Sequence, residues 1–258
     1  MEKFAKFWDL QKSAKAQRTP CQPISEFEPS FSMEEAYTFS HHRAIQHAQA
    51  NRTEIAGKKV GVTSKALLDV FKVSEPAYGY LTRDTMVENG GTIAAGTLLN
   101  PRAEGEVVFL FTRDLNKSGV TRDDVLAATQ VCMGIEIVDG RIKMPFKLQD
   151  LVADNTAAAN YILSEPRLNG ASLDLAKLKM VAKKNGEVAA NGVGSEVFGD
   201  PVNSVVWLAN TLAKSGQLIK KGEIVFSGSF APVGMPFAAG DRVEIEIEGL
   251  GAASFKYA

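Results

Sequence analysis

The stretch Asn100–Phe111, NPRAEGEVVFLF, decides the fold of this chain and the chemistry that it can support. Its last five residues are apolar and predict a buried β-strand, and two carboxylates stand directly before them. Successive side chains of a strand point to opposite faces, so Glu104 and Glu106 point the same way. Gly105 between them has no side chain and lets another part of the molecule approach the backbone closely. Because neighbouring carboxylates repel unless a cation or a shared proton lies between them, a divalent metal is the simplest occupant.

A second predicted strand carries a third carboxylate. In the stretch Val131–Arg141, VCMGIEIVDGR, Glu136 lies within an apolar run, where an unpaired carboxylate is costly to bury. Together, Glu104, Glu106 and Glu136 form the all-oxygen ligand set that Mg²⁺ or Mn²⁺ prefers. The alternative is a solvated pair of glutamates on an exposed strand face, which is common for an E-x-E pattern.

Composition excludes several classes of protein. The chain has 258 residues, 45% of them hydrophobic, and a formal net charge of −1 with acids and bases mixed, so it carries no footprint of a nucleic-acid or membrane-surface protein. No apolar run reaches the length of about 18 residues that a membrane span needs. Charges interrupt residues 1–17, which predicts an amphipathic helix rather than a signal peptide. Cys21 and Cys132 indicate no disulfide framework, and we expect a cytoplasmic protein.

The order of predicted elements indicates an α+β fold in two parts, an N-terminal helical segment (residues 1–55) and a β-rich catalytic domain (residues 56–258). Ser32 and Glu35 form a capping-box pattern at the start of a helix that runs to about residue 50. That helix holds all three histidines, but adjacent histidines do not share a helix face, so we expect packing or solvation there rather than a metal. Residues 75–80 predict a tight turn, and residues 184–186 predict a hairpin.

Seven short motifs then occur in a recognisable order. The chain resembles the 2-oxopent-4-enoate hydratase and 4-oxalocrotonate decarboxylase family, within the fumarylacetoacetate hydrolase superfamily, from about residue 32 to residue 255. The resemblance rests on GKKVGVTS, EPAYGYL, PRAEGEVVF, EIVDGRI, VADN, NGVGSEVFGDPVNSVVWLAN and AGDRVEIEIEGLGAASF.

The resemblance implies a core of mixed, curled β-sheet of the fumarylacetoacetate hydrolase type, with N-terminal and flanking helices. It places the family's Mg²⁺ or Mn²⁺ ligands on Glu104, Glu106 and Glu136, and the family's active-site lysine on Lys59. For the neighbouring Lys58 we expect a position on the surface. The implied partner is a small 2-oxo or 2-hydroxy acid, and the family implies a homo-oligomer that can associate with another enzyme of its pathway.

Four further residues are predicted to contact the substrate. Ser229 and the backbone amides around Gly228 are candidates for binding a carboxylate, with an ordinary Ser/Gly turn as the alternative. Tyr78 belongs to the aromatic turn of EPAYGYL, and Asp154 belongs to VADN, where it is placed to order a water.

The implied reaction is metal-dependent hydration of a small 2-hydroxydienoate to a 4-hydroxy-2-oxo acid, in catabolism of the aromatic meta-cleavage type. The alternative is decarboxylation of 4-oxalocrotonate at the same metal site. Hydratases of the family usually carry an acid at the second position of the motif P-D-[FY]-G, whereas this chain has Ala77 at that position. Related decarboxylases also have an apolar residue there, so Ala77 favours decarboxylation. The C-terminal motifs look more like those of hydratases. Two other hypotheses, hydrolysis of an acylpyruvate with a His-Glu pair and a non-catalytic partner subunit, fit less well, because no histidine follows the leading helix and the glutamates and Lys59 are intact.

Overall fold

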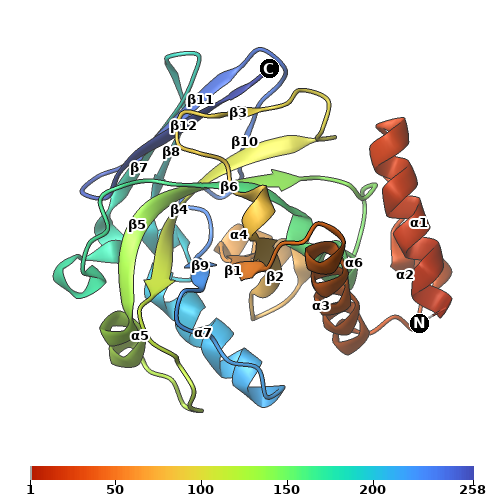
Figure 1. The fold of residues 1–258 in the computed structure, drawn as a ribbon, viewed down its shortest axis with the longest axis horizontal. Helices are drawn as coiled ribbons and strands as arrows, with labels where there is room; N and C mark the ends of the chain where they lie inside the picture. The colour runs from red at the N-terminus through yellow and green to blue at the C-terminus, as the bar shows by residue number, and fades with distance from the viewer. Residues whose placement is uncertain (1) are drawn as a thin grey trace.

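The structure is a computed structural model that describes residues 2–258, with side chains from residue 5 onward. Its core is two β-sheets that pack face to face (Figure 1). The larger sheet has seven strands, in the order β2 (Ala77–Thr82), β1 (Ile55–Gly61), β9 (Ile224–Phe226), β4 (Pro101–Phe111), β5 (Thr129–Asp139) and β6 (Ala158–Leu163), with β10 (Met235–Pro236) paired to β4. The smaller sheet has five, in the order β3 (Thr92–Ile93), β12 (Gly251–Tyr257), β11 (Arg242–Ile247), β7 (Lys179–Lys184) and β8 (Glu187–Val193).

The larger sheet is curled, and one of its faces is concave. Tyr161 on β6 and Phe226 on β9 are three strands apart in the sheet order, yet their ring centroids are only 5.7 Å apart. We call the face that carries these two rings the inner face. Val108, Cys132 and Leu81 fill it with apolar side chains. The opposite, outer face of β4 carries Gly105 and the residues that alternate with it, and it packs against the smaller sheet.

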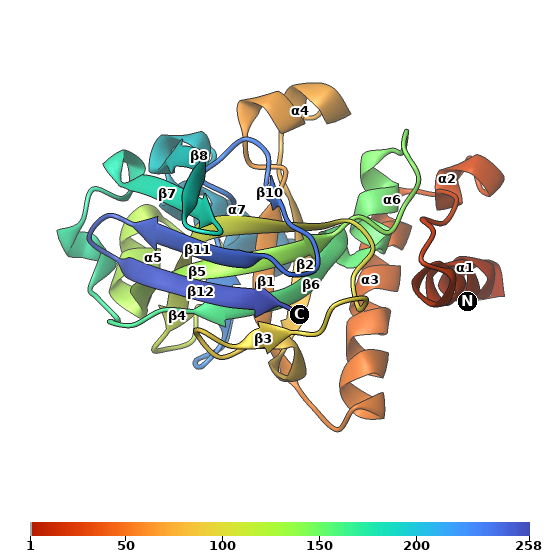
Figure 2. The same cartoon turned by 90° about the horizontal axis from the view of Figure 1, so that it is seen from above.

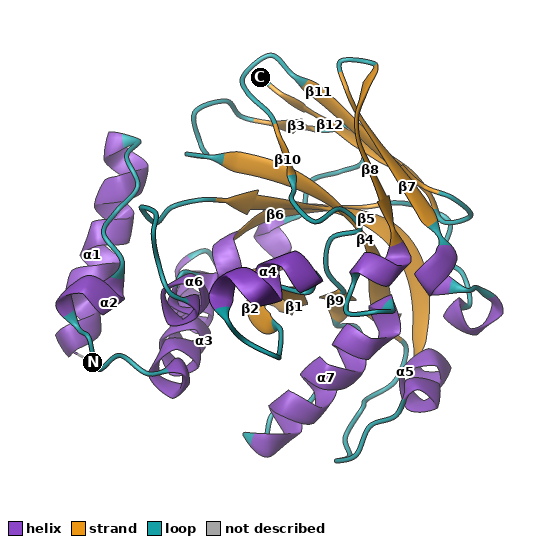
Figure 3. Ribbon diagram, turned by 180° about the vertical axis from the view of Figure 1, so that it is seen from behind, coloured by secondary structure: helices purple, strands orange, loops and turns teal. Residues whose placement is uncertain are grey.

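The two N-terminal helices lie to one side of the sheets, as Figures 2 and 3 show. Most of the other helices lie below the larger sheet in the view of Figure 3. An apolar cluster joins the N-terminal helices to the rest of the chain through Phe7, Phe39, Val152 and Ala77. The helices are α1 (Glu2–Gln17), α2 (Ile24–Phe27), α3 (Met33–Ala50), α4 (Lys65–Phe71), α5 (Arg122–Ala128), α6 (Leu148–Ala153) and α7 (Pro201–Lys214). Short 3₁₀ turns are η1 (Arg83–Thr85), η2 (Asn155–Ala157), η3 (Gly170–Ser172), η4 (Leu175–Lys177) and η5 (Gly194–Glu196). None of the described helices is long and apolar enough to cross a membrane.

Local sequence signals set several element boundaries as predicted. Ser32 and Glu35 form both hydrogen bonds of a capping box at the start of α3. Beyond the predicted boundaries, at the start of α7 the Asp200 side chain accepts the N–H of Val202, and Pro201 stands at the first position, where a missing backbone N–H costs nothing. Asn185 and Gly186 make the two-residue turn between β7 and β8.

One predicted element is wrong. Residues 77–80 were expected in a tight turn, but they open strand β2, which pairs antiparallel with β1. The Pro and Gly signals that favour a turn are overridden by pairing with β1 on one side and by contacts with η2 on the other. The division between an N-terminal segment and a catalytic domain at residue 55 stays a prediction.

Candidate metal centre

Three carboxylates meet on the inner face of β4 and β5. In the antiparallel register Glu104 lies directly opposite Glu136, and Glu106 lies one inward-facing position further along β4. One oxygen from each of the three side chains lies within 4.8 Å of the others. This is the only group of at least three potential metal ligands among the described residues.

The carboxylates are short of hydrogen-bond donors. Glu106 and Glu136 are fully buried. Glu106 Oε2 accepts the N–H of Gly228 at 2.6 Å, but Glu106 Oε1 and Glu136 Oε2 accept no hydrogen bond from the described residues. Buried carboxylate oxygens without a donor are costly, so each of them calls for a cation or a proton.

Burial and mutual repulsion act together on these acids. Burial, and next the charge of Glu136, raise the pKa of Glu104 to about 7. The same two causes raise the pKa of Glu106 well above its usual range. Burial also raises the pKa of Glu136, against the opposing effect of Lys59. A divalent cation would remove this repulsion and take up the oxygens that lack donors, so the residues present fit Mg²⁺ or Mn²⁺.

Lys59 reaches the same cluster from strand β1. It is 2% exposed, and its Nζ lies 3.1 Å from Glu136 Oε1. Although burial lowers the pKa of Lys59, the three carboxylates, Glu136 foremost, outweigh this and raise the pKa above its ordinary value. Without a metal, the carboxylates therefore favour the ammonium form of Lys59.

The expectation that Lys58 lies on the surface is wrong. Its side chain points to the outer face, opposite to that of Lys59, because neighbours in a strand alternate. It is buried there and forms an ion pair of 2.8 Å with Glu223. That partner is far away in the sequence, so no local pattern indicates it.

A strained segment fixes the strand pair that carries Lys59. Asn155, Thr156 and Ala157 all have positive φ, which is unusual for residues with side chains. The Asn155 side-chain amide accepts the N–H of Tyr80 and donates to its C=O, so it completes the edge of β2 like a further strand. Thr156 Oγ1 donates to the C=O of Tyr78 at 2.8 Å.

Two glycines give this segment its room. Gly79 lies opposite Lys59 in the β1–β2 register, and a Cβ there would meet the Asn155 carbonyl oxygen at 2.5 Å. A Cβ at Gly61 would meet Thr156 Cγ2 at 2.8 Å. Sequence reasoning did not single out Gly61, Gly79 or Thr156. A glycine inside a strand is the signal that could have indicated the close approach.

Gly228 lies at the metal centre, as its hydrogen bond to Glu106 shows. It has φ +116°, and a Cβ there would meet Thr63 Oγ1 at 2.3 Å, so no larger residue fits without movement. Ser229 follows it, half-buried, with its Oγ accepting the N–H of Ala231 at 3.3 Å. A substrate role for either residue stays a prediction.

The structure does not bring Tyr78 to the metal centre. Tyr78 lies opposite Val60, so its side chain is on the outer face, where it stacks on Tyr37 with ring centroids 4.4 Å apart. Asp154 is 1% exposed and bound by Gln11 and Arg141, at 2.6 and 2.9 Å. A substrate contact of Tyr78 or Asp154 stays a prediction, and the partners found here, a tyrosine for one and an arginine for the other, depend on the tertiary fold.

Comparison with known proteins agrees with this architecture. The family model "Fumarylacetoacetate (FAA) hydrolase C-terminal" matches residues 45–256. A 2-hydroxyhexa-2,4-dienoate hydratase of Comamonas testosteroni is 43% identical over 239 residues, which cover 91% of this chain and 90% of the relative. A 4-oxalocrotonate decarboxylase of Pseudomonas sp. (strain CF600) is 35% identical, over 81% of this chain and 80% of the relative. The crystallised 4-oxalocrotonate decarboxylase of Pseudomonas putida G7, in complex with magnesium and adipate, superimposes with a TM-score of 0.90 at 29% identity, over 97% of this chain and 95% of the other.

The chain belongs to the fumarylacetoacetate hydrolase family. The curated relatives include both hydratases and a decarboxylase, so the expectation of a lyase of this family is confirmed. The expectation of a curled mixed sheet and of a divalent-metal cofactor is confirmed as well.

Proposed function

We propose that the protein is a divalent-metal-dependent hydratase, which adds water to a small 2-hydroxydienoate and yields a 4-hydroxy-2-oxo acid. The observation that carries this proposal is the buried cluster of Glu104, Glu106 and Glu136 with Lys59 on one face. The 43% identity to a dienoate hydratase over nine-tenths of both chains supports it. We further propose that it works in the cytoplasm as a homo-oligomer, which light scattering after gel filtration would test.

The three glutamates would hold the metal, with Gly228 fixing the orientation of Glu106 through its backbone N–H. When bound, a divalent ion supplies Lewis-acid stabilisation of negative charge on an oxygen of the substrate. The uncommitted carboxylate oxygens and the raised pKa values support this assignment of ligands.

Lys59 is the group of this chain that would move or hold a proton. Its Nζ is buried, charged and next to the proposed metal ligands, so it can donate a proton to a carbon that becomes negative or stabilise an oxygen anion. The segment Asn155–Ala157 would keep the strand pair that carries Lys59 rigid.

Decarboxylation of 4-oxalocrotonate is the second candidate, and Ala77 is the observation that favours it. Ala77 is fully buried and lies opposite Gly61, so it is on the same face as Lys59 and diagonal to it. An acid at this position would stand beside the amine of Lys59, whereas the methyl group of alanine can neither accept nor donate a proton. The 35% identity to a decarboxylase also supports this candidate.

Paired ultraviolet assays with Mg²⁺ separate the candidates. Consumption of 2-hydroxypenta-2,4-dienoate is compared with consumption of 4-oxalocrotonate, and each assay is repeated with a chelator. We expect chelator-sensitive loss of the monoacid. Loss of the diacid alone, with release of CO₂, would make the protein a decarboxylase, and turnover that survives complete chelation would refute the metal assignment. Ala77→Asp should shift the ratio of the two activities towards hydration, and an unchanged ratio would show that residue 77 does not set the reaction.

A further inference from the structure

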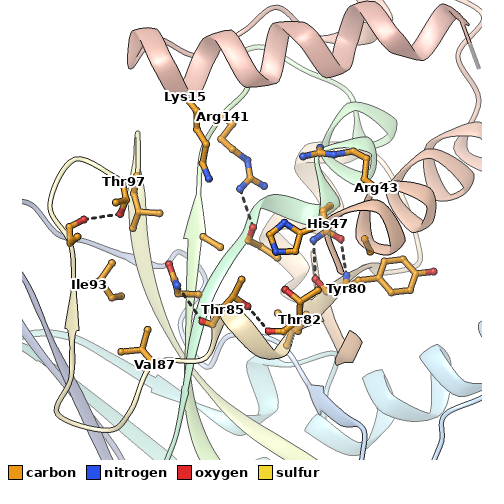
Figure 4. A pocket seen from close by; sticks show the side chains of 18 of the residues that line it. Lys15, Arg43, His47, Tyr80, Thr82, Thr85, Val87, Ile93, Thr97 and Arg141 are labelled. Atoms are coloured by element: carbon orange, nitrogen blue, oxygen red, sulfur yellow. Dashed lines mark hydrogen bonds between the residues drawn. The ribbon is translucent and has the colours of Figure 1, made fainter. Parts of the chain in front are cut away.

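A cavity of about 440 Å³ lies apart from the metal centre. It opens between α1, α3, the loop after β3 and the two edges of the curled sheet, β2 and β6 (Figure 4). Neither Lys59 nor any of the three site glutamates lines it. Its volume is within the range of roughly 300–1,000 Å³ that is typical of small-molecule sites.

The lining of this cavity is strongly unbalanced in charge. Lys15, Arg43 and Arg141 line it, and no described lining residue is an aspartate or a glutamate. Figure 4 shows Lys15 and Arg141 side by side, with both side chains directed into the cavity. Lys15 is an exposed residue of α1. Burial of its amine, and next the charge of Arg141, lower the pKa of Lys15, and a negative charge close by would oppose the effect of Arg141.

Two acids, Asp154 and Asp139, act on the charge of Lys15. Asp154 is held by Arg141 at 2.9 Å and lies 3.7 Å from Arg43, so one carboxylate serves two guanidinium groups. The Oδ1 atom of buried Asp139 accepts two backbone N–H groups, from residues 99 and 100, and its Oδ2 has no hydrogen-bond partner among the described residues. The three cations Lys15, Arg43 and Arg141 therefore face two carboxylates, those of Asp139 and Asp154, and a carboxylate of a ligand would balance the third positive charge.

The cavity also has an apolar lining. Leu81, Ile93 and Leu98 line it, and each is almost fully buried. Thr97 and Asn160 add polar groups. A cavity with both cationic and apolar side chains suits a molecule with an anionic head and a hydrocarbon body.

We propose that this cavity binds a small organic carboxylate, with its carboxylate beside Lys15 and Arg141 and its hydrocarbon part against Leu81, Ile93 and Leu98. Arg43 stacks on Trp8, its guanidinium carbon 4.6 Å from the ring, and keeps the cationic lining in place. The site is separate from the metal centre, so the ligand is not bound there as a substrate. It would be recognised through its charge and through its apolar body.

Isothermal titration calorimetry of the full-length, Mg²⁺-loaded protein tests the proposal, with hexanoate as the anionic probe and hexanol as its uncharged counterpart. We expect hexanoate to bind and hexanol to bind at least about tenfold more weakly, since one charge-assisted contact contributes about 1.4 kcal/mol or more. Raised ionic strength should weaken the binding of hexanoate. Equal affinities for the two probes, or no measurable binding of hexanoate, would overturn the proposal.

Two lysines of the same helix give a matched pair of variants. Lys15→Met should weaken hexanoate binding about tenfold without changing turnover. Lys12→Met should change neither, because Lys12 does not line the cavity and its Nζ contacts only Asp9 and the ring of Trp8 on its own helix. A third variant, Lys59→Met, tests where the ligand binds, and it should leave hexanoate binding unchanged. If Lys59→Met lost hexanoate binding and Lys15→Met kept it, the carboxylate would bind at the metal centre and the proposal would be refuted. Binding is read directly, so this result does not depend on which reaction the enzyme catalyses.

Discussion

Glu104→Gln should stabilise the fold while it removes the metal site. The pKa of Glu104 rises from its usual 4.5 to about 7 in the folded protein, because the carboxylate is buried and faces Glu136. Each unit of difference between the folded and unfolded pKa changes the free energy of unfolding by about 1.4 kcal/mol. In the metal-free protein, ionisation of Glu104 therefore lowers the free energy of unfolding by roughly 3 kcal/mol. Glutamine has nearly the same shape and cannot ionise.

The pH dependence gives the sign of the effect. Below pH 4.5 the glutamate is protonated in both the folded and the unfolded chain, and the variant should be no more stable than the wild type. The difference should grow as the pH rises from 4.5 and should be complete above about pH 7, where it would raise the melting temperature by roughly 5–10 °C. Added Mg²⁺ should reverse the order, since only the wild type gains stability from binding.

Thermal melts at several pH values, with a chelator and then with Mg²⁺, measure both effects. The exposed Glu246→Gln serves as the control, and its melting temperature should stay close to that of the wild type under both conditions. A Glu104→Gln variant that is less stable than the wild type at pH 8 with chelator would refute the reasoning. A difference that does not depend on pH would refute it as well.

Three further outcomes follow from the same site. Lys59→Met should lower kcat by about 10²–10⁴-fold with the fold intact. Lys58→Met leaves Glu223 without its ion-pair partner, so it should lose about 2–3 kcal/mol of stability and keep its turnover per folded molecule. Equal losses of kcat in the two variants would contradict the separation of the two faces. Gly79→Ala should displace the Asn155 carbonyl and reduce kcat about 10²-fold. Gly140→Ala should behave as the wild type in the same steady-state assay, because a Cβ at Gly140 would lie 3.4 Å from its nearest neighbour. Thr156→Val removes a buried hydrogen bond to a strand carbonyl and should cost about 1–3 kcal/mol in a chemical denaturation experiment, with no measurable loss as the contrary result.

The sequence indicated the three proposed metal ligands because the relevant signals are local. The spacing of Glu104 and Glu106 and the apolar run around Glu136 follow from strand periodicity alone. The direct pairing of Glu104 with Glu136 could not be read in the same way, because the register between two strands depends on the whole sheet.

The lysines show where pattern reasoning ends. Lys59 was identified only through the resemblance, since GKKVGVTS by itself does not say which of two adjacent lysines faces a cluster of acids. The burial of Lys58 depends on Glu223, which is 165 residues away. The turn prediction for residues 77–80 is wrong for a related reason: the motif has the composition of a turn, and only the pairing with β1 and with Asn155 makes it a strand.

Gly105, which lies between Glu104 and Glu106, also fixes the register of strand β4 as the protein folds. On the outer face a Cβ at Gly105 would meet Met180 Sδ at 2.5 Å and Ile245 Cγ2 at 2.6 Å. If β4 slipped by one residue, Glu104 or Glu106 would be driven into this space, and both bulk and charge would forbid it. The misaligned sheet therefore cannot pack against the smaller sheet. The contact of Gly105 with the smaller sheet therefore forms only in the register that also brings Glu104 and Glu106 close to Glu136.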